Sequence, residues 1–318
     1  MSPSLSSRAL LSRAIRRLAG GGRSDVVGER IQREMDRLKV LAAQPVTHSV
    51  RAAGLVPSLR QVEFSVFSQF GEDGILQYLV GLLGVEDRSF VELGVESYRE
   101  ANSRFLLVND NWRGLVMDGS TAHVESIQNE EIYWRHDLTA VAAFIDCDNI
   151  DELLRAHGYV GEIGLLSIDI DGNDYWVWEA ISCVSPVLVV IEYNSLFGSE
   201  RAVTIPYDPG FHRARAHYSH LFWGASLRAL RLLGERKGYS LVGCNSNGNN
   251  AFFVRTDRLG PLQPLSEAAA YVPARFRESR DESGRLSYLD REACRELIQD
   301  LLVCDVERDQ VVSLHEVV

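Results

Sequence analysis

Short continuous apolar runs recur along the middle of the chain, and segments with helical spacing of apolar residues stand between them. The runs that predict strands are SFVEL (89–93), GLVMD (114–118), IYWRHD (132–137), GLLSID (164–169) and VLVVIE (187–192). Runs without polar alternation are typical of parallel strands that are covered on both faces. The alternation of strand and helix therefore predicts a doubly wound, mostly parallel α/β sheet.

Two further runs, YSLVGC (239–244) and NAFFVR (250–255), follow a helix predicted over 226–238. A short link rich in Asn and Gly joins them, which favours a hairpin. The last two strands are therefore expected to be antiparallel neighbours in a seven-stranded sheet. This ending is the Rossmann-like arrangement of class I S-adenosylmethionine-dependent methyltransferases, whereas dinucleotide dehydrogenases end in a parallel strand.

The regular pattern divides the chain into three parts. They are a basic, partly helical N-terminal extension (1–60), the α/β domain (61–258) and a C-terminal extension with one helix (259–318). Within the domain, residues 195–225 are more than a compact sheet requires between a strand and a helix. We expect this insertion to form a lid or binding loop.

Charge is unevenly distributed in this chain of 318 residues, whose formal net charge is −11. Such an acidic protein repels phosphate, which argues against nucleic acid as a partner. Residues 1–60 nevertheless carry eleven Arg and Lys against four Asp and Glu. A frayed basic leader, an organelle transit peptide and a helix in weak contact with an anionic membrane surface all have this composition.

No apolar run approaches the roughly 20 residues that a transmembrane helix needs. The five cysteines are scattered and form no C-x-x-C pair, which indicates small buried residues in a reducing compartment. We therefore expect a cytoplasmic protein. The apolar stripe of the C-terminal helix packs either on the core or on a second subunit, so a homo-oligomer stays open.

Acidic residues stand at or near the ends of four predicted strands: Glu92, Asp118, Asp169 and Glu192. Ligands of open parallel sheets bind beyond these carboxyl ends. The loop after the first strand, ELGVESYREANS, has one early glycine where a pyrophosphate-binding loop has three. A nucleoside without phosphates, such as S-adenosylmethionine, fits this loop better than a dinucleotide.

The segment LLSIDIDGNDYWVWEAI (165–181) contains a D-x-D pattern, Asp169-x-Asp171. A glycosyltransferase uses such a pair to hold a metal and a pyrophosphate. Alternatively, Asp171 with Glu192 and Asn194 supplies the hard oxygen ligands that Mg²⁺ or Mn²⁺ prefers. The following Asn and Asp also suit a turn that caps the next helix.

Several blocks together resemble the FkbM-type S-adenosylmethionine-dependent methyltransferases. They are SQFGEDGIL, FVELGVESYREANSRFLL, GLVMDG, LLSIDIDGNDYWVWEAI, VVIEYNS and GASLRALRLLGERKGYSLVGCNSNGNNAFFVR. The resemblance covers residues 67–255 and leaves both extensions unexplained. Its closest branch is associated with polysaccharide or natural-product biosynthesis.

The resemblance implies a set of S-adenosylmethionine contacts. Glu92 and Gly94 match the first cofactor motif, near the methionine amine. The ribose is expected at Asp118, Gly119 and Ser120, and the adenine at His136 and Asp137. Gln69 and Gly71 belong to a block at the methionine end, for which helix capping alone is the alternative.

The chemistry of methyl transfer needs a group that accepts a proton from the acceptor hydroxyl. His217 and His220, in the insertion, have the spacing of one helix face, and histidine is the usual base near neutral pH. Glu192 is the metal-free alternative, and Asp169 is expected to line the cofactor. Aromatic and arginine residues of the same insertion suit a sugar ring or an anionic acceptor.

The sequence thus predicts an O-methyltransferase that uses S-adenosylmethionine, with or without Mg²⁺ or Mn²⁺. The acceptor would be a hydroxyl of a sugar, glycan or natural product. Two alternatives stay open: a metal-dependent glycosyltransferase that uses Asp169 and Asp171, and a catalytically silent methyltransferase-like binding module.

Overall fold

The computed structural model describes residues 21–317, with side chains of residue 28 and of residues 30–317, so most of the predicted basic leader lies outside the described residues. The chain forms two compact units, Met1–His48 and Ser49–Val318, whereas the sequence suggested a boundary near residue 60. Helix α2 (Gly21–Arg51) contains the amphipathic helix of the N-terminal extension. The side chains of Ile31, Met35 and Leu38 on this helix are exposed.

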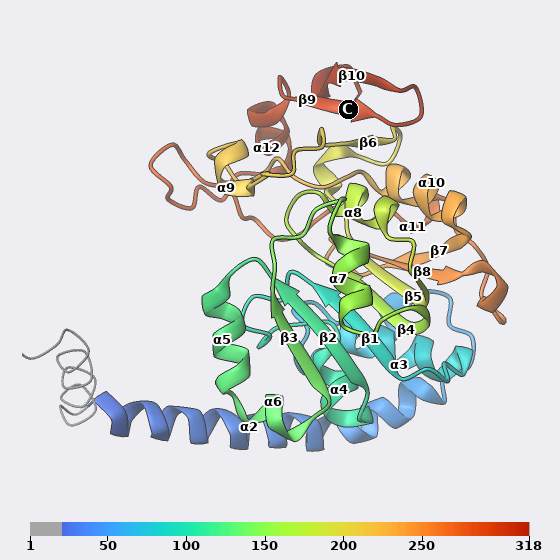
Figure 1. Cartoon of the computed structure of the whole chain (residues 1–318). Coiled ribbons are helices and arrows are strands. Elements are labelled where there is room, and N and C mark those ends of the chain that lie inside the picture. Colours follow the sequence, from blue (N-terminus) through green and yellow to red (C-terminus); the bar gives the residue numbers. More distant parts are fainter. Residues whose placement is uncertain (1–20, 318) are drawn as a thin grey trace, which may run out of the picture. The chain divides into compact units, whose positions relative to one another are not determined.

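The second unit is built on a seven-stranded sheet with the order β3-β2-β1-β4-β5-β8-β7 (Figure 1). Its strands are β1 (Ser89–Leu93), β2 (Arg113–Asp118), β3 (Leu138–Ala142), β4 (Gly161–Ile168), β5 (Val184–Glu192), β7 (Tyr239–Cys244) and β8 (Asn250–Arg255). All neighbouring pairs among β1 to β5 are parallel, and β8 is antiparallel to both β5 and β7. The predicted fold is confirmed, including the closing hairpin.

Helices cover both faces of this sheet. They are α3 (Glu72–Leu83), α4 (Arg104–Asp110), α5 (Thr121–Asn129), α6 (Glu131–Arg135), α7 (Ile150–Ala156), α8 (Asp174–Ala180) and α10 (Leu227–Lys237). Alternate strand residues face two separate apolar clusters, so Phe90 packs on the α3 side and Val91 on the α8 side. The absence of polar alternation in the strands follows from this double cover.

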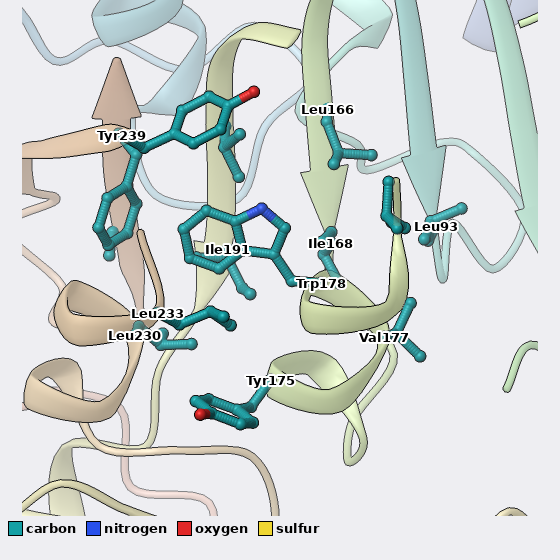
Figure 2. Packing of buried hydrophobic residues seen from close by; sticks show 14 of the residues in the cluster. Leu93, Leu166, Ile168, Tyr175, Val177, Trp178, Ile191, Leu230, Leu233 and Tyr239 are labelled. Atoms are coloured by element: carbon teal, nitrogen blue, oxygen red, sulfur yellow. The ribbon is translucent and has the colours of Figure 1, made fainter. Parts of the chain in front are cut away.

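The apolar cluster on the α8 side of the sheet contains several large aromatic side chains. Figure 2 shows Trp178 of α8 near its centre, with Leu230 and Leu233 of α10 on the same side of the sheet. The rings of Trp178 and Phe253 of β8 lie 5.0 Å apart. Because α8 follows β4 directly, this packing fixes the turn that carries the D-x-D pattern.

The third predicted strand is wrong in position. IYWRHD was expected to form it, but residues Glu131–Arg135 are helix α6 and the strand begins at Leu138. Trp134 is 73% exposed, which a strand covered on both faces would not allow. The small residues of LTAVA form the strand instead.

The insertion and the C-terminal extension, which the sequence treats as separate, share a sheet and an apolar core. In the insertion, η2 (Ser195–Phe197) and β6 (Val203–Thr204) precede α9 (Arg213–Ala216). Strand β6 pairs with β9 (Leu302–Asp305), which pairs with β10 (Gln310–Ser313).

The extension also contains α11 (Glu267–Ala270) and α12 (Arg291–Ile298), so it holds more than the one expected helix. The core that it shares with the insertion includes Phe197, Val203 and Ile298, each at most 1% exposed. Much of the predicted lid is therefore firmly packed. Its exposed residues are concentrated between Tyr207 and Tyr218.

Within the described part of the chain, no helix combines the length and apolar character required to cross a membrane.

Candidate functional site

The carboxyl ends of the parallel strands gather four acidic side chains at one edge of the sheet. Asp118 and Glu192 end β2 and β5, Glu92 lies in β1 and Asp169 follows β4. The parallel register aligns the ends of these adjacent strands. The structure thus brings together acids that are separated by up to a hundred residues in the sequence.

The loop after β1 passes so close to the end of β4 that only glycine fits at position 94. Gly94 has a φ of +80°, and a Cβ added there would lie 1.6 Å from the carbonyl oxygen of Asp169. Its amide donates a hydrogen bond of 2.8 Å to the carbonyl of Met117 at the end of β2. Positive φ and close approach are the two conditions that require glycine. The loop therefore forms a tight cradle over three strand ends.

Glu92 anchors the chain that leads into α4. One carboxylate oxygen accepts the amide of Asn102 at 2.8 Å, and the other accepts the amide of Ser103 at 2.9 Å and its hydroxyl. Burial raises the pKa of Glu92 above its ordinary value. Both oxygens have partners within the protein, and the predicted contact with the methionine amine stays a prediction.

Asp118 joins the loop after β1 to the helix after β2. Its Oδ2 accepts the amide of Glu96 at 2.7 Å, and its Oδ1 accepts the amide of Ser120 at 2.8 Å. Nδ1 of His123 lies 3.1 Å from the same Oδ1. A carboxylate oxygen has two lone pairs, so Oδ2 keeps one for a ligand hydroxyl. Ser120 also caps α5, because its side chain accepts the amide of His123.

The expected adenine contacts at His136 and Asp137 are wrong. Both residues precede β3, and in the parallel register Gly114 pairs with Leu138 while Asp118 pairs with Ala142. His136 and Asp137 therefore lie at the amino end of the sheet, opposite to Asp118. The error follows from placing the third strand too early in the sequence.

Phe144 occupies the position that His136 was expected to fill. Its ring is 50% exposed, and a Cβ on Gly119 would lie 3.4 Å from it. The amide of Ala143 donates a hydrogen bond of 3.0 Å to the carbonyl of Asp118. An exposed aromatic ring beside an acid at the end of β2 suits a nucleoside, whose base stacks on the ring. The residues AF (143–144) after LTAVA were the available sequence signal.

The block before α3 reaches the same edge. Gly71 is the residue before the helix, with a φ of 102°, and Gln69 is exposed. Glu72 accepts hydrogen bonds of 2.7 Å from Asn245 and 2.9 Å from Asn250, which pairs with Glu192 in the sheet. The block thus fixes the end of the hairpin to α3, and contact of Gln69 or Gly71 with a cofactor stays a prediction.

Three carboxylates form a compact group at the ends of β4 and β5. One oxygen from each of Asp169, Asp171 and Glu192 can be chosen so that all three lie within 4.8 Å of one another. Burial, followed by the charges of Asp171 and Asp174, raises the pKa of Asp169 well above its ordinary value. Burial, followed by the charge of Asp169, does the same to the pKa of Glu192. Burial and mutual repulsion therefore favour the binding of a proton by this pair.

Arg213 of α9 is the cation beside this group. Its guanidinium donates to Asp171 at 2.6 Å and to the carbonyl of His220 at 2.7 Å, and it lies 5.1 Å from the ring centre of Trp223. It also lies 3.4 Å from a carboxylate oxygen of Glu278 in the C-terminal extension. One positive charge does not balance three carboxylates, so a proton or a cation completes the site.

Asn194 has a structural role here. Its amide nitrogen donates to the carbonyls of Leu221 and Trp223 at 2.9 and 3.0 Å, and its oxygen accepts the amide of Leu196 at 3.0 Å. Asn194 therefore ties the two ends of the insertion together. Its role as a metal ligand stays a prediction, and both the nitrogen and the oxygen of its amide already have partners within the protein.

The premise that His217 and His220 share a helix face is wrong. Helix α9 ends at Ala216, His217 is extended, and His220 has a φ of 60°. Burial lowers the pKa of His217, which lies 2.7 Å from the hydroxyl of Ser219. Burial and the charges of two arginines lower the pKa of His220, on which Asp171 also acts. Of the two, only His220 has a charged neighbour from the acidic group.

The turn after β4 combines both interpretations of its sequence. Asp171 has a φ of 56°, and the carboxylate of Asp174 accepts the amides of Ile170 and Gly172, each at 2.9 Å. Asp174 thus holds the turn, while Asp171 points to Arg213; Asn173, the residue before α8, makes no capping hydrogen bond with its side chain. The D-x-D pattern and the turn residues perform different tasks.

The residues present fit the two groups that the sequence implied. A divalent cation suits three close carboxylates, of which Glu192 has a buried Oε2 with no hydrogen-bond partner among the described residues. The glycine cradle at Gly94, the oxygen of Asp118 and the ring of Phe144 fit a nucleoside that carries no phosphate.

Comparison with known proteins gives no family model and no curated protein that matches the chain. Solved structures with a similar fold include the O-methyltransferase from Bacillus cereus in complex with SAH. It is 15% identical over 68% of this chain and 88% of that chain, with a TM-score of 0.38. The N-terminal domain of EvdMO1 with SAH bound is 10% identical over 70% and 94%, with a TM-score of 0.39.

A third structure is an S-adenosylmethionine-dependent methyltransferase from Clostridium acetobutylicum. It is 9% identical over 57% of this chain and 89% of that chain, with a TM-score of 0.37. Scores this low carry no argument about function, and the assignment of the fold rests on the strand order.

Proposed function

We propose that this protein is an S-adenosylmethionine-dependent O-methyltransferase of the FkbM type. The observation that carries the proposal is the pairing of two sites along one sheet edge. Asp118 and Phe144, near the ends of β2 and β3, suit the nucleoside, and the half-buried Asp169 and the buried Glu192 lie two to four strands away. The closing antiparallel hairpin, expected for this class, supports it.

The buried carboxyl pair suits the proton transfer that methylation of a hydroxyl requires. S-adenosylmethionine, when bound, supplies an electrophilic methyl group. The acceptor hydroxyl loses its proton as it attacks, and a general base works best when its pKa lies near the working pH. Burial and mutual repulsion move the pKa values of Asp169 and Glu192 upward, toward that range. The ionised Glu192 is therefore the proposed base that accepts the hydroxyl proton, and Asp169 shares that proton after transfer.

Two further features belong to this proposal. If Mg²⁺ or Mn²⁺ is bound, Asp169, Asp171 and Glu192 would hold it and it would acidify the hydroxyl, and a histidine rather than Glu192 would accept the proton. His220 is the second candidate for the base, because it lies beside Arg213 and Asp171. We further propose that the acceptor is a sugar, a glycan or a natural product, since the guanidinium of Arg213 offers hydrogen-bond donors beside the acidic group.

Calorimetric titration with S-adenosylmethionine, SAH and UDP-glucose tests the class of ligand. We expect the first two to bind and UDP-glucose not to bind. Transfer of labelled methyl from S-adenosylmethionine to a cell extract, with Glu192→Gln as control, then tests catalysis. Binding of UDP-glucose alone, dependent on Mn²⁺ and on Asp171, would establish the glycosyltransferase alternative. Binding of S-adenosylmethionine without methyl transfer to any extract would favour the silent module.

A further inference from the structure

A cavity lies between the insertion and the C-terminal extension. Its volume is about 220 Å³, below the range of roughly 300–1,000 Å³ that is typical of pockets for drug-sized ligands. One wall comes from residues 194–196 and from the insertion, and the other from residues 274–278 and 289–294 of the extension. A cavity of this size holds one small ring or one end of a larger molecule.

The cavity borders on the acidic group of the candidate active site. Asn194, in its wall, stands two residues after Glu192. Arg213 lines the cavity and donates to Asp171 at 2.6 Å, so a single side chain belongs to both. A molecule in the cavity therefore lies next to the carboxylates that we propose as the base.

Positive charge predominates in the cavity wall, although the whole chain has a formal net charge of −11. Four arginines line it, against two acids, Glu278 and Asp290. The acids are engaged: Glu278 pairs with Arg213 and Arg280, and Asp290 caps α12 by accepting the amide of Ala293.

Of the four arginines, only Arg213 makes an ion pair with a residue that the structure describes. Arg213 is held by Asp171, and Arg291 donates to the carbonyl of Ser195 at 2.6 Å. Arg275 and Arg277 are exposed. Arg277 donates a hydrogen bond to the carbonyl of Tyr288, and neither arginine makes an ion pair with any residue that the structure describes. Two uncompensated guanidinium groups beside a cavity favour an anionic ligand.

The remaining wall is largely apolar. The ring of Trp223 is only 3% exposed and lies under the guanidinium of Arg213. Phe276 stacks on Phe70, with ring centroids 6.4 Å apart and an interplanar angle of 13°. Such faces suit the CH surface of a ring. The cavity therefore offers a flat apolar surface together with positive charge.

We propose that the cavity binds a small cyclic acceptor that carries a carboxylate or a phosphate, with Arg275 and Arg277 binding the anion. The role as acceptor rests on the proposed methyltransferase function. The carboxylates near Arg213 repel an anion, whereas the extension attracts it. The acceptor is thereby oriented, with its anionic group at the extension and a hydroxyl toward Glu192. The C-terminal extension would thus select the substrate.

Direct binding of three probes to the full chain tests the proposal. Calorimetry with glucuronate, glucose 6-phosphate and glucose is done at low and high salt. We expect at least one anionic sugar to bind about tenfold or more tightly than glucose, as for hydrogen bonds to a charged group. This preference should weaken as salt screens the charges. The better of the two anionic probes identifies the group as carboxylate or phosphate.

A pair of double variants locates the binding. Arg275→Gln/Arg277→Gln should abolish the preference for the anion. Arg285→Gln/Arg308→Gln removes the same charge from exposed positions of the extension outside the cavity wall and should leave the preference intact. Equal affinity for glucose and both anionic sugars, or an anion preference unchanged by Arg275→Gln/Arg277→Gln, would overturn the proposal.

Titration of the same preparation with S-adenosylmethionine separates this proposal from the proposed function. Binding of S-adenosylmethionine without any anion preference would remove the anionic acceptor and leave the methyltransferase. Anion preference without binding of S-adenosylmethionine would support an anion cavity in a protein with a different activity, and the acceptor role would fall.

Discussion

Gly94→Ala tests the close approach of the first loop to β4. Gly94 has a φ of +80°, and the new Cβ would lie 1.6 Å from the carbonyl oxygen of Asp169. A matched control exists in Gly158, which has a φ of +79° and no atom within 4 Å of an added Cβ. Gly158 lies before β4, at the opposite end of the strand. The two substitutions therefore share backbone strain and differ in the clash.

The expected cost follows from these two contributions. The left-handed conformation costs an alanine about 1–2 kcal/mol in both variants. Alanine also has less conformational freedom than glycine in the unfolded chain, which stabilises the folded state of both variants by about 0.4–1 kcal/mol. Only Gly94→Ala adds the displacement of backbone, which costs about 1–3 kcal/mol when a packed region is overfilled. We therefore expect Gly94→Ala to lose about 1–3 kcal/mol more than Gly158→Ala.

Urea unfolding at pH 7, followed by tryptophan fluorescence, measures both free energies of unfolding. Calorimetry should also show weaker binding of S-adenosylmethionine to Gly94→Ala, because its loop moves, and normal binding to Gly158→Ala. Equal losses of stability in the two variants would refute the close approach. Normal ligand binding by a destabilised Gly94→Ala would remove the loop from the cofactor site.

Three further predictions concern the acids at the same edge. Asp118→Ala should weaken S-adenosylmethionine binding by about 1.5–3 kcal/mol, measured calorimetrically, since hydrogen bonds to a charged group are lost; unchanged affinity in the folded variant would exclude Asp118 from the site. Mg²⁺ at ten times its Kd should raise the free energy of unfolding by about 1.4 kcal/mol, and Asp171→Asn should abolish this increase. Full activity in excess EDTA would argue against the metal. Folding raises the pKa values of Asp169 and Glu192, so the folded state binds more protons than the unfolded state. Without added metal, the urea concentration at the unfolding midpoint should therefore fall as the pH rises above about 4.5. Glu192→Gln should reduce that fall, and an identical pH profile would show that the pair does not hold the proton.

The apolar pattern was sufficient to predict most of the sheet. Strand runs such as VLVVIE and the Asn- and Gly-rich link before the last strand depend on local chemistry, because burial on both faces and tight turns select residues nearby in sequence. Asp118 and Glu192 could be placed at strand ends for the same reason. The prediction of a strand at IYWRHD was wrong, because a short run with aromatic residues suits either a strand or a helix. His136 and Asp137 were therefore predicted at the carboxyl end of the third strand, whereas they lie at its amino end.

The sequence by itself determined the fold class, the antiparallel ending and the strand-end acids, since each follows from residues that are neighbours along the chain. The tertiary structure alone decided that β6 of the insertion pairs with β9 of the extension, about a hundred residues later. It also decided that Arg213 joins Asp171, and that Arg275 and Arg277 line a cavity beside them. These contacts have no local signal, because they depend on which distant surfaces bury their apolar residues together. The sequence shows that Asp169 and Glu192 are acidic residues. Their raised pKa values arise only from the burial and proximity that folding imposes.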